Sequence, residues 1–253
     1  MKKLAVIPAR YASSRFEGKP LADICGKPMI LHVYQAVQNS NLFDEVVVAT
    51  DDDRILSAVI NGGAKALMTS SELNNGTERV EQALRILEKD NPQTHYDIVV
   101  NIQGDEPLIK QEMLKELLSG FENNDVDIAT LKKIIENREE VLDSNVVKVV
   151  TAKDNKALYF SRCPIPFNRD ESVEDLLKQR MYYKHIGIYG YRSEVLKKIV
   201  ALNQTDLERI EKLEQLRWLE NGYNIVAMTT EHDTVGVDTK EDLQKVIDIL
   251  NKR

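Results

Sequence analysis

The chain has 253 residues, enough for one large α/β domain, and two independent full domains are not expected. Its 42% apolar and 30% charged residues exclude a disordered or low-complexity chain, and its net charge of −7 argues against general nucleic-acid binding. Cys25 and Cys163 lie far apart and outside any CxxC pattern, which excludes a disulfide framework and a zinc ribbon. The apolar run at residues 4–7 is too short for a signal peptide and no stretch is long enough to span a bilayer, so we expect a cytoplasmic protein.

Short apolar runs alternate with amphipathic stretches over the first half of the chain. This alternation is typical of βαβ units, in which a mostly parallel sheet has helices on both faces. The apolar runs predict strands at residues 4–8, 45–50, 65–69, 97–103 and 127–131. Helical spacing of apolar residues predicts helices at residues 27–38, 53–60, 77–89 and 111–121.

The pattern changes to extended runs at residues 146–151 and 157–160, followed by Pro164-Ile165-Pro166. This change predicts a β-rich insertion. Alternation then predicts a strand at residues 185–191. The remaining chain predicts helices at 194–200, 207–220 and 240–250 and a strand at 225–229.

The first candidate site follows the first strand, where ligands bind in an open α/β sheet. The loop carries the cations Arg10, Arg15 and Lys19 among small residues and Gly18, a composition that suits a polyphosphate. A solvated surface loop is the alternative, but the position after the strand favours a phosphate site. Pro20 stands where a Walker A loop needs Ser or Thr, and neither GxGxxG nor GxSxG occurs in the chain.

Carboxylates form the second candidate site. Asp105 and Glu106 follow the strand at residues 97–103, at the same sheet edge as the basic loop, and Mg²⁺ prefers such hard oxygen ligands beside phosphates. An acidic turn before a helix is the alternative. Asp238 precedes the last helix and is either its N-cap or a second metal-binding carboxylate with Asp105.

Three further features are open to two interpretations each. The turn at residues 74–79 leads into a helix whose N-terminus attracts anions or hydrogen-bonds a base, or is simply capped. His185 and Tyr189 share one face of a strand, which a half-exposed strand explains equally well. Glu214 lies four residues from both Ile210 and Trp218, so we expect it on an apolar helix face, either in a site or at the border of the stripe. The four histidines have no metal-ligand spacing, which argues against zinc.

The chain resembles the 3-deoxy-manno-octulosonate cytidylyltransferases (CMP-Kdo synthetases) from residue 4 to about residue 250. The segments that carry the resemblance are IPARYASSRFEGKPL, ATDDDRI, NGTERV, VNIQGDEPLI, NVVKVV, ALYFSRCPIPFNRD, KHIGIYGYR, LERIEKLEQLRWLENG and VGVDTKEDL. The resemblance implies an α/β, Rossmann-like three-layer nucleotidyltransferase fold with a mostly parallel central sheet. It also implies one cytidylyltransferase domain over residues 1–253, with a smaller β-rich dimerisation and sugar-binding portion at about 144–192, and a homodimer.

The resemblance further implies a reaction and its substrates. The anomeric hydroxyl of 3-deoxy-D-manno-oct-2-ulosonate (Kdo) attacks the α-phosphorus of CTP, and CMP-Kdo for lipopolysaccharide biosynthesis and pyrophosphate form with the help of Mg²⁺. CTP and Kdo are then the partners, with neither nucleic acid nor membrane involved.

The same resemblance implies roles for individual residues. The catalytic residues are Arg15, Lys19, Asp105 and Asp238, and the two aspartates are the Mg²⁺ ligands. The nucleotide-binding residues are Pro8, Ala9, Arg10, Ser13, Arg15, Lys19, Asn75, Gly76 and Arg79. The sugar-binding residues are Gln103, Arg162, His185, Tyr189, Glu214 and Gln215, with Arg162 or its neighbours pairing the sugar carboxylate.

Two alternatives remain at this point. The same chemistry on 8-amino-8-deoxy-Kdo or another 2-keto sugar acid needs only one changed pocket contact. A non-catalytic nucleotide-binding module is an alternative of another class, but it would not need Lys19, Asp105 and Asp238 together.

Overall fold

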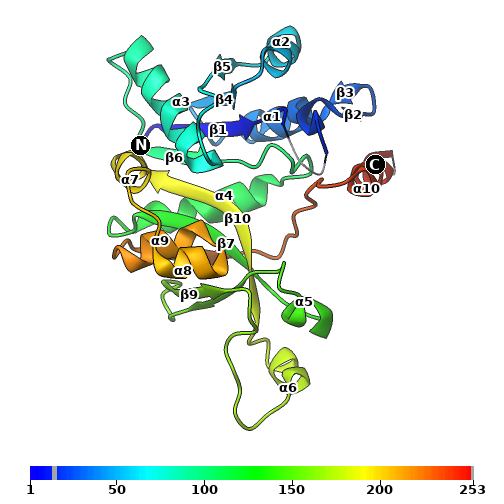
Figure 1. The fold of residues 1–253 in the computed structure, drawn as a ribbon, viewed down its shortest axis with the longest axis vertical. Helices are drawn as coiled ribbons and strands as arrows, with labels where there is room; N and C mark the ends of the chain where they lie inside the picture. The colour runs from blue at the N-terminus through cyan, green and yellow to red at the C-terminus, as the bar shows by residue number, and fades with distance from the viewer. Residues whose placement is uncertain (13–15, 252–253) are drawn as a thin grey trace. The chain divides into compact units, whose positions relative to one another are not determined.

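A computed structural model describes residues 1–12 and 16–251 of the chain (Figure 1). Ser13 and Arg15 of the predicted phosphate loop lie outside the described residues. The chain forms two compact units. The first unit comprises Met1–Leu114, Arg192–Val200 and Thr234–Arg253, and the second comprises Lys115–Tyr191 and Ala201–Asp233.

The first unit is built on four parallel strands in the order β6-β1-β4-β5. The strands are β1 (Lys3–Ala9), β4 (Glu45–Thr50), β5 (Ala66–Met68) and β6 (Ile98–Asn101). β1 lies between two neighbours, with Leu4 opposite Glu45 on one side and Val99 on the other. Because a parallel strand of this kind is covered on both faces, its apolar run is continuous rather than alternating. The predicted α/β class with parallel pairing is confirmed.

Helices α1 and α3 pack against β1 and β4, and α2 packs against β4 and β5. The helices that lie wholly in the first unit are α1 (Met29–Asn39), α2 (Asp53–Asn61), α3 (Gly76–Asp90), α7 (Ser193–Ile199) and α10 (Lys240–Asn251). α4 (Gln111–Ser119) carries the chain into the second unit and is followed by the 3₁₀ turn η2 (Gly120–Glu122). α1 begins two residues later than its spacing predicts, because β2 (Asp23–Ile24) and β3 (Lys27–Pro28) form a hairpin before it.

The second unit contains a mixed sheet in the order β11-β7-β10-β8-β9. Its strands are β7 (Ile128–Ile134), β8 (Lys148–Thr151), β9 (Ala157–Ser161), β10 (Tyr183–Arg192, its last residue in the first unit) and β11 (Ile225–Thr229). β11 and β7 are parallel, whereas β10 runs antiparallel to β7 and β8, and β9 runs antiparallel to β8. The β-rich portion predicted at about 144–192 therefore lies in this unit, apart from its last residue.

The predicted helix at residues 207–220 is wrong in one respect, because it is two helices, α8 (Asp206–Glu211) and α9 (Glu214–Glu220). Lys212 ends α8 in the left-handed region, with φ 55°. The bidentate contact of Arg217 with Glu208, at 2.7 and 2.6 Å, links the two helices. The break also removes the predicted common apolar face, since Ile210 is 67% exposed and Trp218 only 1%.

Two short helices of the second unit were not predicted, α5 (Arg138–Leu142) and α6 (Val173–Lys178). Each begins at a capping side chain, Asn137 for α5 and Ser172 for α6, which accepts a backbone N–H of the first turn. They are too short to display a helical apolar period, so the caps are their main sequence signal.

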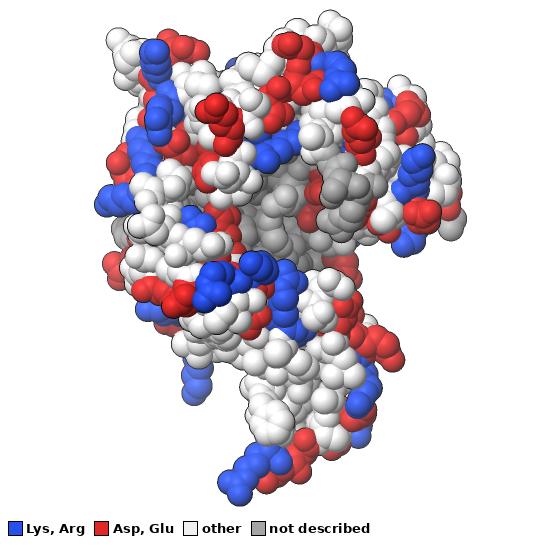
Figure 2. Space-filling model, viewed as in Figure 1, with Lys and Arg blue, Asp and Glu red and all other residues white. Residues whose placement is uncertain are grey.

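Charges of both signs are interspersed over the face shown in Figure 2. Among the residues that the structure describes, no helix is long and apolar enough to cross a membrane.

Candidate active site

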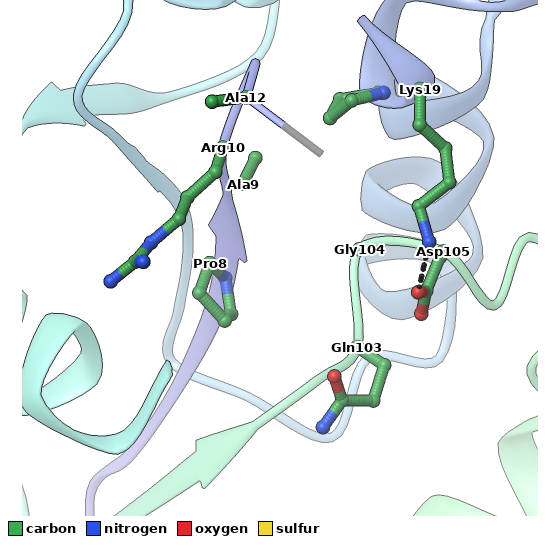
Figure 3. Close-up of a pocket in the computed structure, with 9 residues that line it drawn as sticks. Pro8, Ala9, Arg10, Ala12, Lys19, Gln103, Gly104 and Asp105 are labelled. Carbon is green, nitrogen blue, oxygen red and sulfur yellow. Dashed lines mark hydrogen bonds and ion pairs between the residues drawn. The ribbon is translucent and has the colours of Figure 1, made fainter. Parts of the chain in front are cut away.

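A cavity of about 160 Å³ lies in the first unit, at the carboxyl ends of β1 and β6 (Figure 3). It is the place where the topology of an open α/β sheet puts a ligand. Its lining combines the basic loop after β1 with the acidic loop after β6: Pro8, Ala9, Arg10, Ala12, Lys19, Pro20, Gln103, Gly104 and Asp105.

Lys19 lies at the centre of the charged groups around this cavity. Its Nζ is 2.6 Å from Oδ2 of Asp105 and 3.2 Å from Oδ1 of Asp238. The lysine side chain is only 14% exposed, so solvent weakens these ion pairs less than it weakens pairs on the surface. Local structure fixes the lysine, because Lys19 opens the 3₁₀ turn η1 (Lys19–Leu21) directly after Gly18 in the left-handed region, with φ 69°.

Asp105 owes its position to Gly104. A Cβ on Gly104 would lie 2.8 Å from the carbonyl oxygen of Pro8, which is closer than real Cβ contacts allow. Glycine therefore lets the loop after β6 approach the end of β1. The carbonyl of Asp105 in turn accepts the N–H of Val237 at 2.9 Å, which brings the segment with Asp238 to the same place.

Asp238 is not the N-cap of the last helix. The hydroxyl oxygen of Thr239 accepts the N–H of Asp242 at 3.2 Å, and Oδ2 of Asp242 accepts the N–H of Thr239 at 3.2 Å. This reciprocal pair caps α10 and leaves the carboxylate of Asp238 to contact Lys19. The interpretation of Asp238 as a mere cap is therefore wrong.

The two carboxylates that contact Lys19 fit the ligand preference of a hard divalent cation. Two carboxylates, Asp105 and Asp238, already share one cationic group, and Mg²⁺ is commonly held by one or two carboxylates together with substrate phosphates. Among the described residues no group of three or more His, Cys, Asp or Glu side chains is suited to a metal. The residues thus suit an ion that takes its other ligands from the substrate and water.

Glu106 is the neighbouring carboxyl group and has a different environment. Burial, with the charge of Asp105 as the second cause, raises the pKa of Glu106 to about 8, while a hydrogen bond with Thr234 acts in the opposite direction. Its Oε2 has no hydrogen-bond partner among the described residues. Glu106 is therefore largely neutral at pH 7, unlike a metal ligand, and its sequence position beside Asp105 gave no sign of this burial.

The turn before α3 combines a cap with a close approach to β1. The side chain of Asn75 accepts the N–H of Glu78 at 2.8 Å, so its oxygen serves as the helix N-cap. A Cβ on Gly76 would lie 3.8 Å from the ring of Pro8 and from the amide of Asn101. Asn101 is buried, and its Oδ1 has no partner among the described residues. Sequence analysis missed this side chain, although the polar end of its apolar strand is a visible signal.

Arg10 and Arg79 differ in what they offer to a ligand. Arg10 lines the cavity, and its guanidinium donates to the carbonyl of Leu73. Arg79 is 0% exposed; its guanidinium donates to Thr69 and, at 2.6 Å, to Asp51. Arg79 thus ties α3 to the segment after β4, and its contact with a nucleotide stays a prediction.

In the second unit, His185 and Tyr189 lie together on one face of β10, as predicted. The ring of His185 is 5.3 Å from that of Tyr189 and 5.1 Å from that of Phe160. Burial lowers the pKa of His185 to about 3, so the ring is neutral at pH 7. The strand is not half-exposed here, because Tyr189 is buried and stacks edge-on against Trp218 at 5.1 Å.

Hydrogen bonds indicate which polar atoms these rings offer. The Thr130 hydroxyl donates to the carbonyl of Ile188 at 2.7 Å, so it accepts from Nε2 of His185 at 2.9 Å. Nδ1 of the neutral ring is then an acceptor. The Tyr189 hydroxyl has no partner among the described residues, and burial raises its pKa well above the usual value, with the neighbouring Glu214 adding to the effect. This hydroxyl is therefore a protonated donor.

The remaining predicted sugar-binding residues are divided between the units. Gln103 lines the first-unit cavity, while Glu214 and the buried Gln215 begin α9 in the second unit. Arg162 donates to the carbonyls of Glu211, Ser144 and Lys212 at 2.7, 2.9 and 3.4 Å. These bonds use three of the five N–H donors of a guanidinium. Its pairing with a sugar carboxylate stays a prediction.

Glu211 is a residue that sequence analysis missed. Its carboxylate accepts the Ser161 hydroxyl at 2.6 Å and the backbone N–H of Arg162 at 2.9 Å. It thus holds the end of β9 against the end of α8. No local sequence signal marks it, because its partners lie about 50 residues away in the chain.

The chain is similar to known proteins in sequence and in fold. The family model described as Cytidylyltransferase matches residues 4–228. The chain is 49% identical to a 3-deoxy-manno-octulosonate cytidylyltransferase of Thermodesulfovibrio yellowstonii, with 99% of each chain covered, and 48% identical to one of Fusobacterium nucleatum, with 100% of this chain and 98% of the relative covered. A solved structure of CMP:2-keto-3-deoxy-manno-octonic acid synthetase complexed with CTP is similar, with a TM-score of 0.90, 40% identity and coverage of 100% of this chain and 99% of the other.

These similarities extend over the full length of the chain and confirm the Rossmann-like nucleotidyltransferase fold. They also decide against a non-catalytic binding module, since the relatives that match the whole chain are named as nucleotidyl-transferring enzymes. The chain belongs to the cytidylyltransferase family and, within it, to the 3-deoxy-manno-octulosonate cytidylyltransferases.

Proposed function

We propose that this chain transfers the cytidylyl group of CTP to the anomeric hydroxyl of Kdo, giving CMP-Kdo for lipopolysaccharide biosynthesis and pyrophosphate. The observation that carries the proposal is the contact of Lys19 with both Asp105 and Asp238 beside the first-unit cavity. The relatives are named for this reaction, and the similar solved structure contains CTP.

The chemical step needs charge neutralisation more than covalent catalysis. The anomeric hydroxyl gives its proton to water, its oxygen bonds to the α-phosphorus, the bond from that phosphorus to the bridging oxygen breaks, and pyrophosphate leaves with the electron pair. Arg10 and Lys19 neutralise the triphosphate and the leaving group, and Arg15 and Ser13 of the same loop assist them. Pro8, Ala9 and the turn at Asn75 and Gly76 are proposed to read the cytosine.

Asp105 and Asp238 are the residues that would hold Mg²⁺. When bound, the ion supplies positive charge to the phosphate oxygens and lowers the pKa of the attacking hydroxyl. Lys19 is released from the two carboxylates as its ammonium turns to the phosphates, and Gly104 keeps the loop of Asp105 close to the end of β1.

Polar groups of the second unit are proposed to bind the sugar acid. Nδ1 of His185 accepts a sugar hydroxyl, and the protonated hydroxyl of Tyr189 donates to a sugar oxygen. Glu214 and Gln215 bind further hydroxyls, and Arg162 pairs the carboxylate with the donors that it does not spend on carbonyls. A buried phenol without a partner is costly, and a sugar oxygen would satisfy it.

Assembly and location follow as part of the same proposal. Leu158 is 59% exposed and Phe167 86% exposed on or beside the β-rich portion, and large exposed apolar side chains commonly mark interfaces. We place a homodimer contact there. Both cysteines are free, which suits a reducing cytoplasm.

Pyrophosphate release from CTP and Mg²⁺ tests the proposal, with Kdo, 8-amino-8-deoxy-Kdo and N-acetylneuraminate compared as acceptors. We expect release that depends on Kdo. Equal kcat/KM for the amino analogue would contradict specificity for Kdo but leave the chemistry intact, whereas no release with any acid would contradict the proposed function. An Asp105→Asn variant should be inactive at saturating Mg²⁺, and Asp125→Asn, an exposed aspartate remote in sequence, serves as the control.

A further inference from the structure

Asn101 is a buried polar side chain to which the reaction described above gives no role. It ends β6, lies opposite Val6 of β1, and is only 4% exposed. Its Oδ1 accepts no hydrogen bond from the described residues. A buried amide oxygen without a donor is costly, so its presence in a fold calls for an explanation such as a bound ligand.

The amide of Asn101 lies beside the N-terminus of α3. Gly76 is the first residue of this 15-residue helix, and a Cβ there would lie 3.8 Å from Nδ2 of Asn101 and 3.8 Å from the Pro8 ring, both ordinary contact distances. Gly76 does not have a positive φ, so neither the backbone nor a close approach requires glycine at this position. The effect of glycine is to leave open the space that a side chain would fill, next to Pro8 and Asn101.

This space adjoins the first-unit cavity. Pro8 lines that cavity, and so do Gln103 and Gly104, which follow Asn101 closely in the chain. The N-terminus of a helix carries partial positive charge, and its N–H groups suit an acceptor. The amide of Asn101 adds a donor, Nδ2, and an acceptor, Oδ1. A ligand that fits these groups is a flat, neutral heterocycle with a donor and an acceptor side by side.

We propose that Asn101 is a specificity-determining residue that recognises the base of the nucleotide. Cytosine has its 4-amino donor next to the N3 acceptor, and an asparagine amide pairs with the same kind of donor and acceptor on adenine in DNA. Oδ1 of Asn101 accepts the 4-amino group and Nδ2 donates to N3, while the base lies in the space that Gly76 leaves open. Solvent does not reach Oδ1 in the fold, so its hydrogen bond to the base replaces no bond to water. The inference rests on the proposed function and names the side chain that reads the base.

The test compares CTP with 2-pyrimidinone ribonucleoside triphosphate, which is CTP without its 4-amino group. Equilibrium binding of both nucleotides is measured for the wild type and for Asn101→Leu, which is similar in size but has no polar side-chain atom. The wild type should bind CTP about five- to tenfold more tightly than the analogue, the size of one hydrogen bond to a buried group. Asn101→Leu should bind the two nucleotides equally, because it has lost the partner of the amine.

Three further measurements separate recognition of the base from support of the fold. Oδ1 accepts no hydrogen bond inside the fold, so the thermal midpoint of Asn101→Leu should stay at or above the wild-type value. Gly76→Ala fills the space for the base and should weaken both nucleotides by the same factor. Asn91→Leu, at an exposed position at the other end of α3, is the matched control and should change neither binding nor stability.

A wild type that binds the two nucleotides equally would overturn the inference, as would an unchanged preference for CTP in Asn101→Leu. An equal loss of affinity for both nucleotides in Asn101→Leu would also overturn it, because Asn101 would then support the site without contacting the amine. If Asn101→Leu does not fold, the smaller Asn101→Ser, whose hydroxyl is too short to reach the base, is measured in the same way and decides the matter. CTP binding with the expected preference but without pyrophosphate release would refute the proposed function alone, and a wild type that binds neither nucleotide would refute both.

Discussion

Replacing Glu106 by glutamine should change how the stability of the protein depends on pH. The carboxyl group has a pKa of about 8 in the fold against 4.5 as its ordinary value, so the fold favours the neutral form. Below pH 4.5 both the folded and the unfolded chain carry the proton, and Glu106 has no effect on stability. Between pH 4.5 and 8 only the unfolded chain loses it, so stability falls with rising pH; above pH 8 the loss is constant.

The size of this effect follows from the shift in pKa. Each pH unit between the two values costs about 1.36 kcal/mol, so the free energy of unfolding should fall by about 4 kcal/mol between pH 5 and pH 8 from this group alone. Glu106→Gln removes that fall. Any loss of the Thr234 contact in the variant is independent of pH and does not affect the comparison.

The assay is urea unfolding of both proteins at pH 5 and pH 8, followed by circular dichroism. Tryptophan fluorescence would not report on the unit that contains Glu106, because the one tryptophan, Trp218, lies in the second unit. The difference between variant and wild type should move by about 4 kcal/mol in favour of the variant at the higher pH. Glu112→Gln, at an exposed position of α4, is the control and should show no such change. A difference that is the same at both pH values would refute the reasoning, because Glu106 would then ionise normally in the fold.

Three further predictions concern the site and its support. Asp238→Asn should lower the rate of pyrophosphate release at least about 100-fold, since it removes one of the two carboxylates proposed to hold Mg²⁺ at the reacting phosphates, while Asp248→Asn on α10 should not; an unchanged rate for the first would contradict that role of Asp238. Gly104→Ala should lower the free energy of unfolding by about 1–3 kcal/mol and weaken CTP binding, because its methyl group meets the Pro8 carbonyl. If the variant unfolded and bound CTP like the wild type, the loop would have to move enough to accommodate the methyl group. His185→Phe should remove the acid sensitivity that this histidine gives to the free energy of unfolding. The folded pKa of about 3 lies below the ordinary 6.5, so the wild type loses stability as the pH falls below 6.5, by about 3 kcal/mol at pH 4.5. If urea unfolding gave the same difference between variant and wild type at pH 7 and at pH 4.5, this prediction would be contradicted.

Local pattern predicted the elements whose side chains contact mainly their own sheet or helix. The strands β4 and β11 have the predicted bounds, because a run of apolar residues bounded by polar ones is sufficient to define a buried strand. The break between α8 and α9 depends instead on Lys212 in the left-handed region and on the pairing of Arg217 with Glu208. Neither is visible in helical spacing.

The candidate site is likewise divided between features that local pattern predicts and features that depend on tertiary contacts. The position of Lys19 and Asp105 after parallel strands predicted that they lie at one sheet edge, and they are in contact. The neutral state of Glu106 and the burial of Arg79 depend on tertiary enclosure, which neither the spacing nor the motifs of the sequence show. The capping of α10 by Thr239 and Asp242, rather than by Asp238, depends on how the two side chains lie in the fold.

The shared contact of Lys19 has a thermodynamic consequence for the two carboxylates. An ammonium group that moves toward an anion gives up contact with Asp105 and Asp238, so anion binding and the charge balance of the carboxylates are linked. Linkage is reciprocal: a polyanion that attracts Lys19 raises the affinity of the carboxylates for cations, and a cation at the carboxylates raises the affinity of the ammonium for anions by the same free energy. With the proposed function, a nucleotide and a cation at the two carboxylates would therefore favour each other's binding through one lysine.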